Sequence, residues 1–276
     1  GTGDDGVIDG GRFITTNLPA VSNTAVSLSG LIKNAIFESE GANLFNNGCE
    51  IYNSEVTSTY VNTVQNNSVA RFCKFKQTST SGDRGLIISL SKAYYCEVFN
   101  ASTNANSIEV SGTDSELWYC IGEGSATNKA GIEITDSSGT PKGLYYCTGI
   151  NTGTGYGGII RNCVEVKNCT FIGGPSSTGG VFCNSNDATI ENCSIKCENT
   201  APNMRSFIDS SGIGTIRVYN CLIESAGTDS TNSMFFGNGK TVYLTDNKIK
   251  GGTGIDNVNG NSQTTSSDAF GNIILD

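Results

Sequence analysis

The sequence contains no histidine, only two methionines and four prolines, and a single tryptophan among its 276 residues. Without histidine, a serine or cysteine nucleophile has no imidazole to act as its base, and a zinc site would have only cysteine and carboxylate ligands. No Cys-x-x-Cys pair is present either. We therefore expect no metal centre and no cofactor.

Positive charge is scarce and scattered. The chain has 17 lysines and arginines against 26 aspartates and glutamates, which gives a formal net charge of -9. Binding to a phosphate backbone needs a basic patch, so no nucleic-acid partner is expected. No apolar run reaches the length of a membrane-spanning helix, and no basic start followed by an apolar core opens the sequence. We therefore expect neither membrane insertion nor a secretory signal.

Cysteine is abundant, with 11 residues, and eight of them recur at intervals of 22 to 28 residues. They are Cys49, Cys73, Cys96, Cys120, Cys147, Cys169, Cys193 and Cys221, and Asn247 and Ile273 continue the series. Self-similarity at a period of this size is typical of repeat architectures. A small apolar side chain at the same buried position of every repeat explains the spacing. The thiols are therefore expected to be free, as in a protein made in a reducing cytosol.

Each repeat contains short apolar segments with period-2 alternation, bounded by glycine, asparagine and serine, which is typical of strands. One repeat cannot bury its own apolar face, but stacked repeats can. Parallel crossovers are nearly always right-handed. The sequence predicts an all-β fold, a right-handed single-stranded parallel β-helix of about ten rungs over residues 41–276. Residues 1–40 are expected to form an irregular N-terminal cap or first rung.

The residue just before the repeated cysteine changes character along the chain. It is aromatic in four repeats and then mostly asparagine, in the order Phe72, Tyr95, Tyr119, Tyr146, Asn168, Asn192, Asn220, Asp246 and Asn272. Rings one rung apart would stack, and asparagine tolerates the left-handed conformation of a tight turn. We expect an aromatic ladder that gives way to an asparagine ladder at one corner of the coil.

Two glutamates occupy equivalent positions in neighbouring repeats. Alternation in the segments around Glu109 and Glu133 places both side chains on the outer face, as direct lateral neighbours. Paired carboxylates are the groups that cleave glycosidic bonds, and a separation of about 5 Å suits a retaining enzyme. The alternative is that both are solvated surface glutamates with no catalytic role.

A second candidate site is an aromatic stripe two residues before the cysteine. Tyr94, Trp118 and Tyr145 are expected to point outward on successive rungs and to form a flat exposed ladder. Large exposed apolar patches usually mark binding sites, so the stripe is a candidate for binding sugar rings. A contact between chains of an oligomer and a loop that covers the stripe are the alternatives.

The repeated apolar-x-Asn-Cys-x-apolar pattern, as in Val166-Lys-Asn-Cys and Ile190-Glu-Asn-Cys, resembles that of the pectin-lyase-like β-helix superfamily. Within it, residues 40–276 look most like the β-helical body of a bacteriophage tailspike or tail fibre. This resemblance implies a homotrimer in the virion tail, with a host surface glycan and other virion tail proteins as partners. The catalytic motifs of the polygalacturonase and pectate-lyase branches contain histidine, so no catalytic residue is carried over from them.

Three functions remain open at this point. The first is a phage receptor-binding protein that recognises, with or without cleavage, a host surface polysaccharide. The second is a secreted bacterial adhesin or polysaccharide-degrading enzyme, and the third is a purely structural fibre module. If the protein is an enzyme, we expect a glycoside hydrolase or polysaccharide lyase that acts as a depolymerase.

Overall fold

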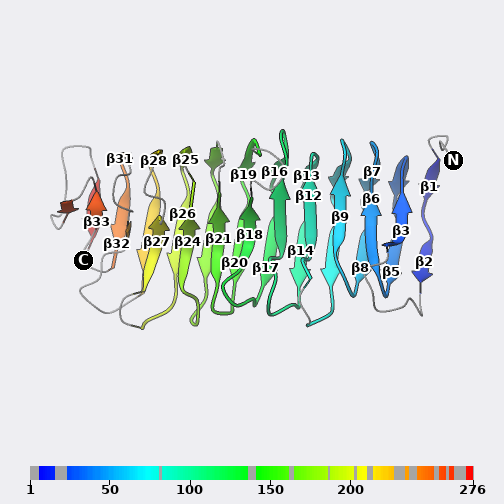
Figure 1. Cartoon of the computed structure of the whole chain (residues 1–276), viewed down its shortest axis with the longest axis horizontal. Coiled ribbons are helices and arrows are strands. Elements are labelled where there is room, and N and C mark those ends of the chain that lie inside the picture. The colour runs from blue at the N-terminus through cyan, green and yellow to red at the C-terminus, as the bar shows by residue number, and fades with distance from the viewer. Residues whose placement is uncertain are drawn as a thin grey trace.

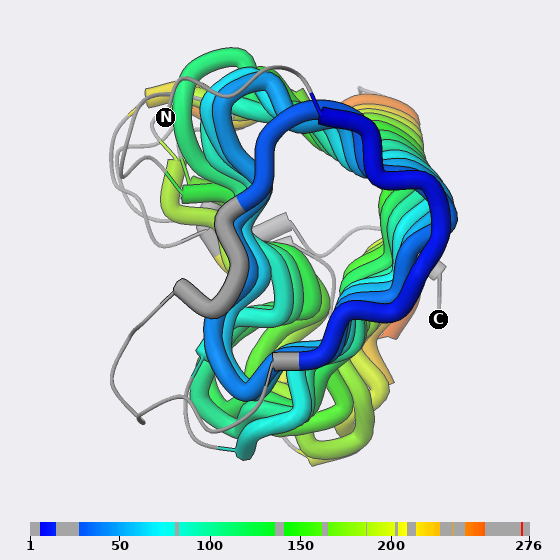
Figure 2. Tube along the Cα trace, turned by 90° about the vertical axis from the view of Figure 1, so that its right-hand side faces the viewer, coloured from blue at the N-terminus to red at the C-terminus, as the bar shows by residue number. Residues whose placement is uncertain are grey.

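The computed structural model describes residues 6–15, 24–80, 83–135, 141–161, 165–185, 187–201, 204–209, 214–226, 234–235, 241–251, 255–258, 261–263 and 272–275. The regular elements in these ranges are all β-strands, and none of these residues forms a helix able to cross a membrane. The strands wind into an elongated coil with the two termini at opposite ends (Figure 1). Seen from the N-terminal end, the chain turns clockwise as it recedes, so the coil is right-handed (Figure 2).

Each turn adds one strand to each of three parallel sheets, which we call A, B and C. Sheet A has 11 strands and sheets B and C have 12 each. The predicted fold class is therefore confirmed, and the number of turns differs slightly from ten. The pair β33–β34 near the C-terminus is antiparallel, unlike the pairs before it.

The strands are short throughout, and their bounds by sheet are as follows. Sheet A contains β1 (Val7–Asp9), β4 (Leu31–Lys33), β7 (Glu50–Tyr52), β10 (Val69–Arg71), β13 (Lys92–Tyr94), β16 (Glu116–Trp118), β19 (Gly143–Tyr145), β22 (Glu165–Lys167), β25 (Asp187–Glu191), β28 (Thr215–Tyr219) and β31 (Thr241–Thr245). Sheet B contains β2 (Arg12–Thr15), β5 (Ile36–Ser39), β8 (Glu55–Ser58), β11 (Lys74–Gln77), β14 (Glu97–Asn100), β17 (Ile121–Gly124), β20 (Thr148–Asn151), β23 (Thr170–Gly173), β26 (Ser194–Cys197), β29 (Leu222–Ser225), β32 (Lys248–Lys250) and β35 (Ile273–Leu275). Sheet C contains β3 (Thr24–Leu28), β6 (Ala42–Phe45), β9 (Asn62–Gln65), β12 (Leu86–Ser89), β15 (Ile108–Ser111), β18 (Ala130–Ile134), β21 (Tyr156–Ile160), β24 (Gly179–Cys183), β27 (Arg205–Asp209), β30 (Met234–Phe235), β33 (Ile255–Val258) and β34 (Asn261–Gln263).

The core is a stack of equivalent side chains along the axis of the coil. In sheet C, Leu86, Ile108 and Ile132 are paired in register on successive strands and have no exposed surface. Because alternate residues of a strand point to opposite faces, every buried residue places its neighbours on the outer face. Burial of the inner rows therefore fixes which side chains the protein presents to solvent.

The corner between sheets A and B is a single residue in the left-handed conformation. Its φ lies between 46° and 58° in Asn34, Asn53, Phe72, Tyr95, Tyr119, Tyr146, Asn168, Asn192, Asn220 and Asp246. Tyr95 and Tyr119 stack with ring centroids 4.7 Å apart and planes 1° from parallel. The Asn220 amide donates a 2.7 Å hydrogen bond to the Asn192 side-chain oxygen. The predicted change from an aromatic to an asparagine ladder is confirmed as far as Asp246, whereas Asn272, expected in this row, lies in the buried position of the cysteine series.

The predicted register of the cysteine series is wrong at its N-terminal end. Cys49 lies before a strand of sheet A, whereas Cys73 and the cysteines after it in the series lie before strands of sheet B. The backbone N–H of Cys49 donates to the hydroxyl of Ser68, 19 residues later, at the corner between sheets C and A. The residue equivalent to Cys73 one turn earlier is Ser54, which accepts from the N–H of Ala35, also 19 residues away. The first turns are shorter because their connections are shorter, so an interval of 24 residues does not return to the same position.

At the C-terminal end, the series continues with Asn272 and not with Ile273. The N–H of Asn247 donates a 3.1 Å hydrogen bond to the side-chain oxygen of Asn272, as the N–H of Cys221 does to Asn247 at 2.9 Å. Ile273 begins the next strand, β35. Asparagine thus replaces cysteine in the same buried position and satisfies the backbone groups there.

The strands before residue 40 belong to the same three sheets as the rest. β1 pairs with β4 and β2 pairs with β5, both in parallel register. Residues 1–40 were expected to form an irregular cap or first rung, and residues 1–5 and 16–23 of this segment lie outside the described residues. The proposed domain boundary stays a prediction.

The ten cysteines that the structure describes are free and buried. The thiol of Cys147 donates to the carbonyl oxygen of Tyr145 at 3.3 Å, and the thiol of Cys169 donates to that of Lys167 at the same distance. The expectation of free structural thiols is confirmed for these residues.

Candidate functional site

The two candidate catalytic glutamates lie side by side on the outer face of sheet C. Glu109 in β15 and Glu133 in β18 are direct register partners, so the predicted lateral pairing is confirmed. Their side chains are only 12% and 8% exposed. The alternative of two solvated surface glutamates therefore does not describe them.

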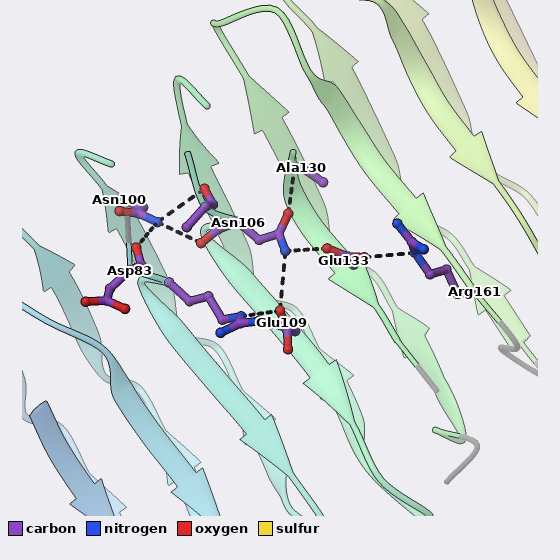
Figure 3. Close-up of polar contacts among 9 residues, drawn as sticks. Asp83, Asn100, Asn106, Glu109, Ala130, Glu133 and Arg161 are labelled. Carbon is purple, nitrogen blue, oxygen red and sulfur yellow. Dashed lines mark hydrogen bonds and ion pairs between the residues drawn. The ribbon is translucent and has the colours of Figure 1, made fainter. Parts of the chain in front are cut away.

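A buried asparagine joins the two carboxylates. The side-chain amide of Asn106 donates a 3.4 Å hydrogen bond to Glu109 and a second hydrogen bond to Glu133 (Figure 3). Its oxygen accepts from the N–H of Ala130 at 2.8 Å, which fixes the orientation of the amide. Asn100 in turn donates to the backbone oxygen of Asn106 at 2.7 Å. A polar group in a connection before β15 thus positions both carboxylates.

Each carboxylate is also paired with an arginine at the outer end of the cluster. Arg84 pairs with Glu109. The Nε of Arg161 lies 2.9 Å from a carboxylate oxygen of Glu133 (Figure 3). The arginine side chains are 46% and 40% exposed, unlike the glutamates between them. The resulting cluster, which we call the Glu–Arg array, comprises Arg84, Asn106, Glu109, Glu133 and Arg161. Two cations and two anions leave the array without formal net charge.

The array has an apolar neighbour on each side in the outer row of sheet C. Glu109 lies beside Ile87 on one flank, and Glu133 lies beside Ile159 on the other. Ile159 is followed in register by Phe182. Low-polarity surroundings strengthen the electrostatic contacts of the charged groups. The array therefore offers ordered hydrogen-bond donors and acceptors between apolar neighbours, of which Ile159 is buried.

Sequence reasoning found the glutamates and missed Asn106, Arg84 and Arg161. The glutamates occupy strand positions that the repeat defines. The other three precede or follow strands, where no repeated position marks them. Within the described ranges, no group of three or more histidine, cysteine or acidic side chains is arranged to hold a metal ion.

The predicted aromatic stripe lies in register on sheet A but is not evenly exposed. Trp118 is the strand neighbour of both Tyr94 and Tyr145, and it stacks on Tyr145 with centroids 4.1 Å apart. Tyr145 is only 7% exposed, so the prediction of three exposed rings is wrong at this position. The reason is Gly143, where an added Cβ would lie 2.9 Å from the Tyr145 ring. The ring covers this glycine, and its hydroxyl donates to Glu165 at 2.9 Å.

Trp118 is held by a buried carboxylate. Its indole N–H donates to Glu116 at 3.1 Å, and Lys142 and Lys92 pair with the same carboxylate at 2.9 and 3.3 Å. Burial on its own would raise the pKa of Glu116, but hydrogen bonds from Lys142, Trp118 and Lys92 lower it overall. Tyr94 lies under the guanidinium of Arg71, 5.1 Å from its ring centroid. A sugar-binding role for Tyr94, Trp118 and Tyr145 stays a prediction.

A row of exposed aromatic residues lies at the neighbouring corner instead. Phe72, Tyr95, Tyr119 and Tyr146, which we call the corner stack, are 41% to 48% exposed. Desolvation and the neighbouring Tyr95 and Tyr146 raise the pKa of Tyr119. The rings lie face to face, so most of them present only edges and hydroxyl groups to solvent.

Comparison with known proteins identifies the fold and no family. No family model matches the sequence, and no curated protein matches it. Among solved structures, the A-module of mannuronan C-5 epimerase AlgE6 from Azotobacter vinelandii is similar with a TM-score of 0.52 and 9% sequence identity. The match covers 98% of this chain and 91% of that one. At this level of identity the similarity establishes a parallel β-solenoid fold, shared with an enzyme named for its action on a polysaccharide.

Proposed function

We propose that this protein binds a host surface polysaccharide through the outer face of sheet C, as the receptor-binding body of a phage tailspike or tail fibre. The observation that carries the proposal is the pairing of Glu109 and Glu133 through the amide of Asn106. Carboxylates accept hydrogen bonds from sugar hydroxyl groups, and guanidinium and amide groups donate them. The flanking Ile87 is partly exposed and provides apolar surface for the C–H face of a sugar ring, whereas Ile159 on the other flank is buried.

The array is better suited to binding than to cleavage. A glycosidase needs one carboxylic acid that donates a proton and one carboxylate that acts as base or nucleophile. Here each carboxylate already pairs with an arginine, so neither is well placed to donate a proton. Cleavage remains the second candidate, because neighbouring parallel strands are about 4.8 Å apart, close to the spacing of about 5 Å in retaining glycosidases.

The assignment to a virion rests on the resemblance to tailspikes. The name of the solved structural neighbour gives a polysaccharide as its substrate, which agrees with a glycan ligand on this fold. A homotrimer in the virion tail, in contact with other tail proteins, belongs to the same proposal. A secreted adhesin or depolymerase and a structural fibre module are the competing functions.

The test is incubation of the purified chain with capsular and O-chain polysaccharides, followed by affinity electrophoresis and size analysis of the glycan. We expect retention of a glycan, weakened about tenfold or more by Glu133→Gln, because hydrogen bonds to charged groups contribute about 1.5–3 kcal/mol. Glu97→Gln is the matched control, since Glu97 is exposed on sheet B and pairs with Lys74 only at 3.5 Å. Shortened glycan would support the depolymerase, and retention unaffected by Glu133→Gln would contradict this site.

A further inference from the structure

The corner stack ends differently at its two termini. At the N-terminal end, Tyr52 packs edge-on against Phe72, with centroids 5.3 Å apart and planes at 67°. At the C-terminal end, Tyr146 stacks on Tyr119 at 4.7 Å, and its other face turns toward the next turn of the coil. The equivalent residue in that turn is Asn168, and no described aromatic ring covers this face of Tyr146. We call this face of Tyr146, which has no aromatic partner among the described residues, the open face.

The aromatic residues in this row are unfavourable for the backbone. All four have φ between 54° and 58°, a region in which bulky residues are strained. The same row uses asparagine before and after them, with the same conformation and without this penalty. Stacking offsets part of the strain, since each pair contributes about 0.5–1.5 kcal/mol. Four successive residues that are unfavourable for their own backbone conformation are typical of a functional surface.

The asparagine beside the open face has a free amide. The side chains of Asn34 and Asn53 bond to each other at 2.8 Å, and those of Asn192 and Asn220 bond at 2.7 Å. The side chain of Asn168 makes no hydrogen bond to the part of the chain that the structure describes, although its backbone N–H bonds to Glu191. An uncovered ring and an unused donor and acceptor thus lie next to each other.

We propose that a pyranose ring stacks on the open face of Tyr146 and hydrogen-bonds through its hydroxyl groups to the amide of Asn168. The ligand class rests on the proposed polysaccharide binding, but the site is a second one, at the corner between sheets A and B. Rings in the stack lie 4.7 to 5.0 Å apart, so the next ring position is the space beyond the short Asn168 side chain. A sugar with a face of C–H bonds continues the stack there, and its polar rim reaches the amide.

The aromatic residues of the corner stack suggest a variant that would block the proposed sugar site. Asn168→Tyr would extend the stack by one ring and cover Tyr146, and Tyr146→Asn would remove the ring while restoring the residue most common in this row. Asn220→Tyr is the matched control, with the same substitution in the same conformation two turns farther along. Circular dichroism melting confirms that each variant folds.

The probes are the methyl β-glycosides of glucose, galactose and N-acetylglucosamine and the glycan retained in the polysaccharide panel. We expect at least one glycoside to shift the Tyr146 ring signals in ¹³C NMR and to show saturation transfer. Both effects should disappear in Asn168→Tyr and Tyr146→Asn and persist in Asn220→Tyr. If Tyr146→Asn does not fold, the wild-type shifts and Asn168→Tyr still decide the question.

Two failures can be told apart. Glycan retention that depends on Glu133 but is unchanged in Asn168→Tyr, with no shift of Tyr146, overturns this site and leaves the proposed function intact. Glycoside stacking on Tyr146 together with glycan retention that is unchanged in Glu133→Gln overturns the assignment to sheet C and keeps this site. A chain that binds no glycan or glycoside overturns both.

Discussion

Replacement of Asn106 by alanine should destabilise the fold far more than an ordinary substitution in a connecting loop. The buried amide makes hydrogen bonds to both glutamates and accepts one from the N–H of Ala130. Alanine leaves that buried N–H without its partner and removes the donor that separates two carboxylates. Because Glu133 is one of the two carboxylates that the amide bonds, the loss should depend on the charge of Glu133.

The magnitude follows from these contacts. An unsatisfied buried N–H costs about 1–3 kcal/mol, and a hydrogen bond to a charged group contributes about 1.5–3 kcal/mol. Two like charges about 5 Å apart repel by roughly 3 kcal/mol at an effective dielectric constant of about 20. Because the loop can relax and the arginines remain in place, we expect Asn106→Ala to lower the free energy of unfolding by about 3 kcal/mol.

A double-mutant cycle measures this coupling. Urea unfolding at neutral pH is compared for wild type, Asn106→Ala, Glu133→Gln and the double variant, with Asn104→Ala in the same loop as the control. Removing one charge relieves the repulsion, so the double variant should be at least about 1 kcal/mol more stable than the sum of the single effects predicts. The control should stay within about 0.5 kcal/mol of wild type. Additive effects, or a loss below about 1 kcal/mol in Asn106→Ala, would refute the electrostatic role assigned to Asn106.

Three further outcomes are expected. The pKa of Glu116 is lowered in the folded state, so the stability that this carboxylate contributes is present above pH 4.5, its unfolded pKa, and is lost as the pH falls below that value. The fluorescence of Trp118 should report this acid transition, and Glu116→Gln should remove the transition. The pKa of Tyr119 is raised in the folded state, so the free energy of unfolding should decrease as the pH rises above about 10. Tyr119→Phe keeps the ring but has no hydroxyl to ionise, so it should lessen the fall in melting temperature. Burial raises the pKa of Cys49 to about 12, so a thiol reagent should react slowly with the native protein and titrate close to 11 thiols after unfolding, whereas markedly fewer would indicate disulfides.

The corner row shows how local and global preferences combine in this fold. Every corner residue adopts the left-handed conformation because the chain must turn sharply from sheet A to sheet B. Asparagine satisfies this demand locally, whereas Tyr95 and Tyr119 satisfy it only because each has a ring above and below. The stacking partner of each ring therefore belongs to another turn of the coil, and the row is stable as a unit.

Much of the architecture could be predicted from the repeat. Apolar residues at fixed intervals specify stacked short strands, and the period fixes the register of the central turns. The pairing of Glu109 with Glu133 and the aromatic-to-asparagine change at the corner followed from that register alone. At the N-terminal end the same reasoning placed Cys49 at the wrong corner, because a shorter turn gives no sign of its length in the cysteine spacing.

The sequence by itself thus determined the coil, its strands and which residues share an outer face, since burial of repeated apolar positions dictates all three. Only the tertiary structure decided what surrounds the candidate residues. Asn106 and the two arginines reach the glutamates from connections that do not repeat. Tyr145 is buried because Gly143 leaves room for its ring. Such contacts depend on the shape of the folded chain in three dimensions, and no periodic pattern along the sequence encodes them.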